Sequence, residues 1–241
     1  MKRSVIMTAI GLVVAVTAAA GCSSTATETT GAQQDAVVAS ASAVTAAAPA
    51  ASAAGPSCAD GGVCAFGDTG PGGGLVFYVA SSPFSAPGTA CGDTCMYLET
   101  PPNDSSGPMA WCAGPGAAAG FSVDALGTAI GTGWLNTQAM LGTTNSPPAE
   151  ICTSGAAQAA STTFGGLTDW YLPSHDELQT LMDAVQGGDL CLKYGCNFTA
   201  TGYWSSTQAS GKNNSTAYCF GQQMGICSKT DMEAVHAIRA F

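Results

Sequence analysis

The sequence predicts a single α+β domain that is rich in disulfides and combines small antiparallel sheets, two or three helices and many loops. Three observations predict it. The chain of 241 residues contains 11 cysteines, a density typical of disulfide-stabilised proteins outside the cytosol. Short β-branched and aromatic runs alternate with segments rich in Gly, Ser, Thr and Asn, as in strands joined by turns. One segment, residues 174–186, instead has the spacing of an amphipathic helix with a capped start.

The first 21 residues have the layout of an export signal. Residues 1–3 are Met-Lys-Arg, and residues 4–20 form an uncharged apolar stretch that is at the short limit for spanning a bilayer. The stretch ends in Ala19-Ala20-Gly21-Cys22, which resembles the lipobox at which bacterial lipoprotein precursors are cleaved and acylated. We therefore predict a signal peptide over 1–21 and a lipid, such as palmitate, on Cys22. Ordinary secretion is the alternative, because Ala19 replaces the usual leucine.

A stalk follows the signal. Residues 22–57 comprise the lipidated cysteine and a segment dominated by Ala, Ser and Thr, without aromatic residues. Such a composition cannot bury enough surface to offset the entropy of ordering. We expect a disordered stalk that tethers a domain over 58–241 to the cell membrane or outer membrane, at the cell surface, with the lipid anchor as its membrane contact.

The cysteines also support export. Assigning Cys22 to lipid leaves ten, an even number that allows five disulfides. A zinc site is the alternative, but the chain has no Cys-x-x-Cys and only two histidines to complete one. Pairing of neighbours closes short loops most easily, which predicts the pairs Cys58–Cys64, Cys91–Cys95, Cys112–Cys152, Cys191–Cys196 and Cys219–Cys227.

In the first half of the domain we expect two strands and two helices. A turn-rich segment, 67–73, leads into a strand over 74–79, and it lacks the lysine and the following helix of a phosphate-binding loop. A second strand is expected over 95–99. The segment 125–141 has a partial helical stripe that glycines weaken before residue 133, so we expect its helix mainly after Gly133. A short helical turn is expected over 156–161.

The clearest local signal is a capping box at Ser174 and Glu177. The serine oxygen accepts the backbone N–H of Glu177, and the glutamate carboxylate accepts the N–H of Ser174. Leu178, Leu181, Met182 and Val185 then share one helical face, and two glycines at 187–188 end the helix. Acids in the first turn complement the helix dipole, which gives His175, Asp176 and Glu177 a structural role. A catalytic group is the alternative.

The last third of the chain predicts a small antiparallel sheet. Segments 202–207, 217–220 and 234–241 are rich in aromatic and β-branched residues or alternate in polarity. Segments 211–214 and 221–223 have the composition of loops between them.

The net charge of the chain limits the classes of partner that it can bind. The formal net charge is −10 at pH 7, and cleavage of the basic signal makes the mature protein more acidic. This argues against nucleic acid, which is bound by clusters of Lys and Arg. The chain has no Gly-x-Ser-x-Gly or His-Glu-x-x-His motif, so we expect no enzyme, no cofactor and no metal. Calcium held by Asp60, Asp68 or Asp93 is the alternative, although their spacing is not that of an EF-hand.

Five blocks stand in order along residues 64–241. They are Gly-Asp-Thr-Gly-Pro-Gly-Gly-Gly with Val-Phe-Tyr at 67–78, Gly-Thr-Gly with Asn-Thr at 131–137, Asp-Trp-Tyr-Leu-Pro-Ser with Asp-Glu-Leu at 169–178, Tyr-Trp-Ser-Ser-Thr at 203–207, and Ile-Arg-Ala-Phe at 238–241. Together they resemble the C-terminal domain family of the Legionella collagen-like adhesin. The ordered set makes this resemblance more specific than any single motif.

The resemblance implies an α+β domain with a C-type-lectin-like fold, in which a comparable Leu-Pro-Ser-x-x-Glu block opens a helix. The adhesin for which the family is named binds sulfated polysaccharides and forms a trimer behind a collagen stalk. This chain has no Gly-x-y repeat and is strongly acidic. Both departures weaken the transfer of sulfated-glycan binding and of trimerisation.

These observations predict a surface-exposed lipoprotein with a non-catalytic, adhesin-like or lectin-like domain that binds a glycan or an envelope component. A structural or assembly lipoprotein with a protein partner and no small ligand is the alternative. Trp170 and Trp204 lie inside the blocks, so we expect them in the core. Because sugar sites combine aromatic faces with amide groups, the predicted ligand-binding residues are Trp111, Trp134, Asn136, Asn213 and Asn214.

Overall fold

The computed structural model describes residues 55–103, 105–114, 123–144, 151–198, 200–209 and 215–241. The predicted signal peptide, Cys22 and the stalk up to residue 54 lie outside the described residues. Those that are described belong to one unit, Ser52–Phe241, which is a small mixed α+β domain. Among them, no helix is both long enough and apolar enough to cross a bilayer.

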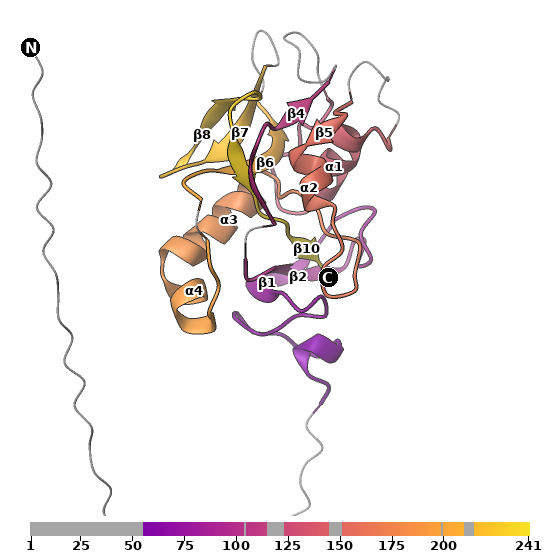
Figure 1. Ribbon diagram of the computed structural model, residues 1–241. Helices are drawn as coiled ribbons and strands as arrows, with labels where there is room; N and C mark the ends of the chain where they lie inside the picture. The colour runs from indigo at the N-terminus through magenta and orange to yellow at the C-terminus, as the bar shows by residue number, and fades with distance from the viewer. Residues whose placement is uncertain (1–54, 104, 115–122, 145–150, 199, 210–214) are drawn as a thin grey trace, which may run out of the picture. The chain divides into compact units, whose positions relative to one another are not determined.

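The elements alternate short strands with short helices (Figure 1). A single 3₁₀ turn, Cys58–Asp60, precedes them. In chain order they are β1 (Leu75–Phe84), β2 (Cys95–Thr100), β3 (Ser106–Met109), β4 (Cys112–Ala113), α1 (Gly133–Leu141), β5 (Ser154–Gly155), α2 (Ala156–Ala160), α3 (His175–Gln186), α4 (Asp189–Tyr194), β6 (Tyr203–Gln208), β7 (Thr216–Phe220), β8 (Met224–Ser228), β9 (Glu233–Val235) and β10 (Arg239–Ala240).

The strands form three sheets. The first has the order β1-β2-β10 and the second the order β3-β9-β6-β7-β8, while β4 and β5 pair with each other. Within these sheets, all described strand pairs are antiparallel except β6 with β9, which run parallel. In Figure 1 the β1-β2-β10 sheet lies at the end where the chain enters the domain, and β6, β7 and β8 lie toward the opposite end. The predicted sheet in the C-terminal third is thus confirmed, with one parallel pair added.

The predicted single strand over 234–241 is wrong. The chain leaves the five-stranded sheet after β9 and joins the three-stranded sheet as β10. Between them, Ile238 exchanges two backbone hydrogen bonds of 2.9 Å with Tyr171. Residues 234–240 are all buried, so their polarity pattern does not show where one sheet ends and the next begins.

The helices follow the expected positions, with one addition. Helix α1 begins at Gly133, α2 occupies 156–160, and the Ser174–Glu177 capping box opens α3 with both of its hydrogen bonds. The addition is α4, whose six residues carry too short a pattern to be recognised.

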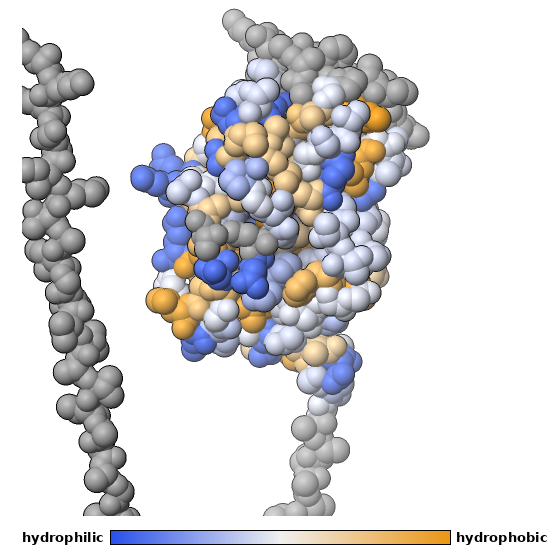
Figure 2. Space-filling model, viewed as in Figure 1, coloured by the Kyte–Doolittle hydropathy of each residue, from blue (hydrophilic) through white to orange (hydrophobic). Residues whose placement is uncertain are grey.

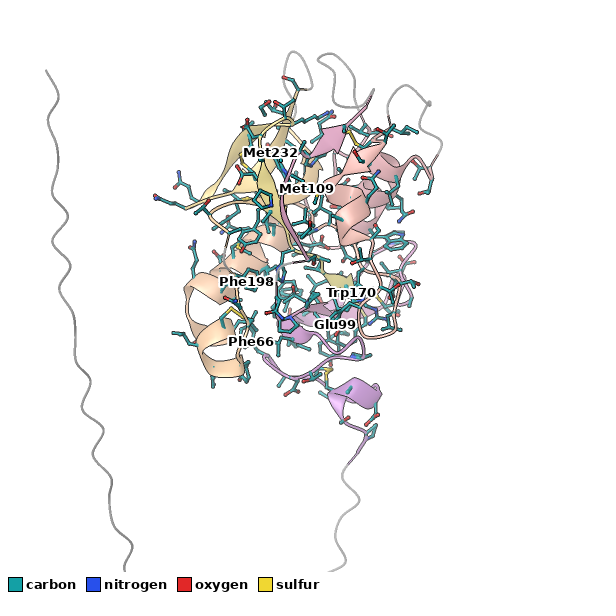
Figure 3. All side chains as sticks on the ribbon, viewed as in Figure 1. Phe66, Glu99, Met109, Trp170, Phe198 and Met232 are labelled. Carbon is teal, nitrogen blue, oxygen red and sulfur yellow. A yellow bond between two sulfur atoms is a disulfide. The ribbon has the colours of Figure 1, made fainter. Side chains whose placement is uncertain are left out.

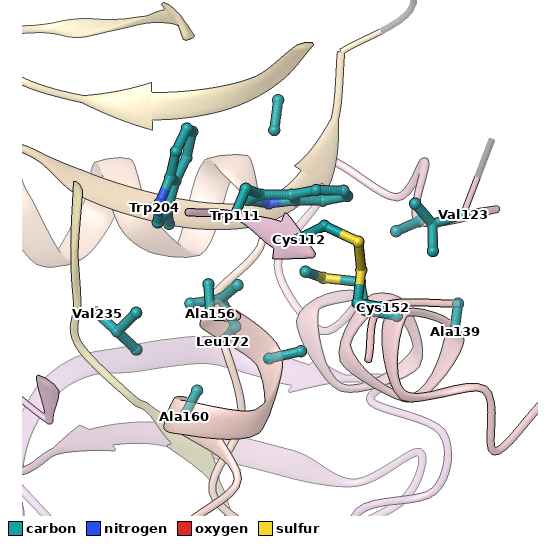
Figure 4. Packing of buried hydrophobic residues seen from close by; sticks show 14 of the residues in the cluster. Trp111, Cys112, Val123, Ala139, Cys152, Ala156, Ala160, Leu172, Trp204 and Val235 are labelled. Carbon is teal, nitrogen blue, oxygen red and sulfur yellow. A yellow bond between two sulfur atoms is a disulfide. The ribbon is translucent and has the colours of Figure 1, made fainter. Parts of the chain in front are cut away.

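Tryptophans organise one of the two main core clusters (Figure 4). Trp111, Trp170 and Trp204 are fully buried. Their indole N–H groups donate to the carbonyl oxygens of Ser205 at 2.7 Å, Phe164 at 3.0 Å and Met109 at 2.8 Å, respectively. Burial of an aromatic ring with its N–H satisfied is the favourable arrangement for tryptophan. The prediction that Trp170 and Trp204 are core residues is confirmed.

All five predicted disulfides are present with the predicted pairing. Four join cysteines four to eight positions apart, whereas Cys112–Cys152 spans 40 positions. In the chain-entropy treatment, closing the 40-residue loop raises the free energy of unfolding by about 4 kcal/mol, and each short disulfide raises it by about 2 kcal/mol. The Cys112–Cys152 bond lies beside the Trp111 ring in the core (Figure 4).

Hydrophobic side chains on the viewed surface stand in separate patches among hydrophilic ones (Figure 2). The most exposed large ones in the described residues are Val63 and Leu192, each 89% exposed, followed by Ile226 and Met232 at about 60%. Scattered exposed apolar residues are normal for a soluble domain.

Candidate ligand pocket

A buried carboxylate holds the glycine-rich loop that precedes β1. Glu99, on β2, is fully buried and accepts the backbone N–H groups of Gly72 at 2.9 Å and Gly74 at 3.1 Å. The same carboxylate receives Arg239 Nη1 at 2.9 Å, and Arg239 Nε donates to Asp169 at 2.7 Å. Burial raises the pKa of Glu99, and the Arg239 hydrogen bond opposes this rise. Residues from three of the sequence blocks, together with Glu99, therefore form one structural ion network.

This network fixes the position of Trp170. A Cβ atom placed on Gly72 would lie 2.6 Å from the Trp170 ring and 2.7 Å from a Glu99 oxygen. Glycine is therefore required at this position, where loop, carboxylate and indole meet. Figure 3 shows Glu99 beside Trp170.

A tight turn holds Phe164 against the indole. Phe164 and Leu167 exchange two backbone hydrogen bonds around Gly165 and Gly166, whose φ angles of 58° and 80° suit glycine. The Phe164 and Trp170 rings meet edge to face with centroids 5.3 Å apart. Both ends of the pair are thus fixed before any ligand arrives.

Next to these rings lies a pocket of about 190 Å³, which we call the ligand pocket. Trp170, Pro101 and Ala237 are all buried behind its inner wall, and Phe164 supplies a partly exposed ring. Asn103, Thr162 and Thr163 are exposed at its rim. Its described lining residues are Pro101, Pro102, Asn103, Ser105, Thr162, Thr163, Phe164, Trp170 and Ala237.

The described lining residues are uncharged and suit an uncharged ligand. None of them is ionisable, so they supply no general acid, general base or charged nucleophile. Ser105 Oγ accepts the N–H of Ala237 at 2.8 Å, which leaves its hydroxyl hydrogen available to donate. Rings, prolines, hydroxyl groups and an amide together suit an uncharged group with both apolar and hydroxyl faces.

The capping-box region forms a second buried network rather than an open site. Glu177 is fully buried and accepts Ser174 N–H at 2.7 Å, Gly131 N–H at 2.8 Å and the Tyr171 hydroxyl at 3.2 Å. Burial raises the pKa of Glu177, and the hydrogen bonds from Ser174 and Gly131 oppose it. Burial, then the charge of Glu177, also raises the pKa of Tyr171. The Glu177 carboxylate therefore faces protein groups, not solvent.

The neighbouring His175 and Asp176 lie at the surface. Their side chains meet at 2.6 Å between Nδ1 and Oδ1, with 27% and 49% of each side chain exposed. The His175 ring packs edge to face on Tyr218 at 4.7 Å. Among the described residues they do not line the ligand pocket.

Two of the predicted ligand-binding residues are core residues, which corrects their assignment. Trp111 is fully buried, with Lys229 Nζ 4.7 Å from the centre of its ring. Burial lowers the pKa of Lys229 to about 8. Asn136 is 3% exposed, and its amide bonds Gly127 N–H at 3.0 Å and Gly127 C=O at 2.7 Å. Neither side chain is free to contact a ligand.

The other three predicted residues stand apart from the pocket. Trp134 is partly exposed and packs edge to face on Tyr171, with centroids 6.0 Å apart. It is not among the described lining residues of the ligand pocket. Asn213 and Asn214 lie outside the described residues.

The three loop aspartates are engaged separately. Asp60 accepts the Ser57 hydroxyl, Asp68 accepts the N–H of Ala65, and Asp93 accepts the Ser85 hydroxyl. Across the described part of the chain, no three His, Cys, Asp or Glu side chains gather as a set that could hold a metal ion.

The comparisons with known proteins assign no family. No family model matches the chain, and no curated protein matches it. A fimbrial protein from Bacteroides ovatus ATCC 8483, known from a crystal structure at 1.85 Å resolution, is similar with a TM-score of 0.46 and 16% sequence identity. The similarity covers 70% of this chain and 44% of that one, so this chain spans less than half of its length.

Proposed function

We propose that this protein is an exported, surface-exposed lipoprotein whose domain binds an uncharged glycan or envelope component without catalysis. The ligand pocket carries the proposal, because the partly exposed Phe164 ring and Pro102 stand beside hydroxyl and amide groups. This combination matches a sugar ring, which presents C–H surface on its faces and hydroxyl groups at its edge. The pocket is smaller than the several hundred Å³ typical of drug-sized sites, so it fits one sugar ring or a group of that size.

The location outside the cytoplasm has its own support. Five disulfides are expected in an oxidising compartment, and the first 21 residues have the layout of an export signal. We place the lipid anchor at Cys22. Within this proposal the fold is of the C-type-lectin-like kind that the resemblance to the collagen-like adhesin domain implies.

The test is a glycan array probed with the oxidised protein and with two matched variants. Thr163→Trp fills the ligand pocket from its exposed rim, whereas Thr168→Trp places the same ring on an exposed position of the same segment, away from the described lining. We expect the wild type and Thr168→Trp to bind the same neutral glycan class. Binding by Thr163→Trp should be weaker by about tenfold or more, a loss of about 1.4 kcal/mol.

A finer pair tests the amide at the rim. Asn103→Ala removes a pocket amide, and Asn197→Ala removes an exposed amide from the segment that pairs with it, outside the described lining. Only the first change should weaken binding. If the folded, disulfide-complete protein binds no glycan, the proposal fails and the assembly role with a protein partner replaces it.

A further inference from the structure

A second pocket contains the carboxylate of Glu233. Unlike Glu99, this carboxylate is not held by a network of protein hydrogen bonds. Glu233 begins β9, which pairs with β3 through Met109 and runs parallel to β6. Its carboxylate lies directly over Gly202, the residue before β6. A Cβ atom on Gly202 would stand 1.8 Å from Glu233 Oε2, so the absence of a side chain at position 202 gives the carboxylate its place.

The carboxylate of Glu233 has no hydrogen-bond donor among the described residues. The sulfur of Cys227 lies 4.0 Å from Glu233 Oε1. Cys227 is bonded to Cys219, so this sulfur carries no hydrogen to donate. Glu99 and Glu177 each accept at least three hydrogen bonds, and Glu233 is the contrasting case.

Apolar side chains line one part of the pocket around this carboxylate. The pocket around it has a volume of about 220 Å³, and Met232, 60% exposed, stands beside its opening. Figure 3 labels Met109, at the end of β3, and Met232, just before β9. Its described lining residues, which define the Glu233 pocket, are Pro108, Ala200, Thr201, Gly202, Met232, Glu233 and Ala234.

The missing partner has a definite chemistry. Glu233 is partly shielded from water. A partly shielded carboxylate without protein donors is compensated best by a charged N–H donor. Loss of water raises the pKa of Glu233, and nearby Asp231 adds to the rise. A cation in the pocket would relieve both effects. The apolar lining, in turn, suits a hydrocarbon stem next to the charge.

We propose that the Glu233 pocket binds a primary ammonium group carried on a short alkyl stem, as in a small alkylamine or a lysine side chain. The ammonium donates to the Glu233 carboxylate, and the stem lies against Met232, Ala200 and Pro108. This site is separate from the ligand pocket and does not depend on the proposed glycan binding, because the two pockets share no described lining residue.

The experiment is a titration of the full-length chain, labelled with ¹³C on its methionine methyl groups, with butylammonium chloride. The chain has eight methionines, and Met232→Leu identifies the signal that lies at the pocket. We expect a saturable shift of the Met232 signal with butylammonium and none with butanol, which has the same stem without the charge. A parallel titration with Nα-acetyllysine amide measures whether a protein side chain binds more tightly than the free amine.

Three variants separate the pocket from general charge attraction. Glu233→Gln removes the charge, and Gly202→Ala keeps it but displaces the carboxylate, whose flexible end is the atom group that the new Cβ meets. Both should weaken binding by about tenfold or more. Asp231→Asn removes one nearby negative charge without changing a lining residue, so it should weaken binding clearly less than Glu233→Gln does. Equal shifts with butanol, or unchanged binding by Glu233→Gln, would overturn the proposal.

Discussion

Glu99 and Glu177 are both buried glutamates that hold glycine loops by their backbone N–H groups, yet only Glu99 is paired with an arginine. Arg239 bridges Glu99 and Asp169, and the partners come from positions 72, 74, 169 and 239. Glu177 is held by neutral donors, two of them within six positions, at the start of a helix. The first network joins distant parts of the chain, and the second fixes one helix terminus.

The difference shows two solutions to the same problem, the burial of a negative charge. In the first, the Arg239 charge compensates the Glu99 carboxylate, so removal of either side chain leaves the other as an uncompensated buried charge. In the second, the Glu177 carboxylate is compensated by several neutral hydrogen-bond donors and by the helix dipole, each of which contributes a small amount. The two regions should therefore respond to substitution by different amounts.

The largest effect is expected for Arg239→Met. This change leaves the Glu99 charge buried without its cation, which costs about 3–5 kcal/mol of unfolding free energy. Urea unfolding of the oxidised protein measures it. The double variant Glu99→Gln with Arg239→Met removes both charges and should recover about half of the loss or more. If the double variant is as unstable as the single one, packing and not charge holds this region together.

A smaller effect is expected for Glu177→Gln. The amide accepts one hydrogen bond through its oxygen, but its NH₂ group faces N–H donors, so we expect a loss of about 2 kcal/mol. Ser174→Ala removes only the cap oxygen and should cost about 1 kcal/mol. The same urea series compares them. A loss for Glu177→Gln as large as that for Arg239→Met would remove the distinction between the two regions.

The same contrast explains how much of the fold followed from the sequence. The capping box, the turns, β1, β2, α1 and the disulfide pairing were predicted, because the signals for these elements lie mostly within short segments. The Glu99 network was not, because its two charged partners, Glu99 and Arg239, stand 140 positions apart. The path of residues 234–241 between two sheets was missed for a related reason, since complete burial removes the alternation that marks a strand face.

The candidate site was predicted least well. Trp111 and Asn136 carry groups that suit a sugar, but the same groups suit a core, where Ser205 and Gly127 use them. Apart from Phe164, Trp170 and Ala237, the ligand pocket is lined by Pro, Asn, Ser and Thr, which are common loop residues without a recognisable spacing. The pocket at Glu233 likewise could not be predicted, because Gly202, which makes room for its carboxylate, lies 31 positions earlier in the chain.

The smallest expected effect is a dependence of the free energy of unfolding on pH that arises from Glu177. Its pKa is higher in the folded protein than in the unfolded chain, because burial disfavours the charged form. The folded state therefore holds the proton more tightly, so this contribution to stability is complete below the unfolded pKa and is lost as the pH rises through the folded one. The wild type should gain stability relative to Glu177→Gln as the pH falls from 7 toward 4. Asp183→Asn, at an exposed position of the same helix, supplies the background in parallel urea series, and a gap that stays constant or shrinks toward acid would mean that hydrogen bonds outweigh burial at this carboxylate.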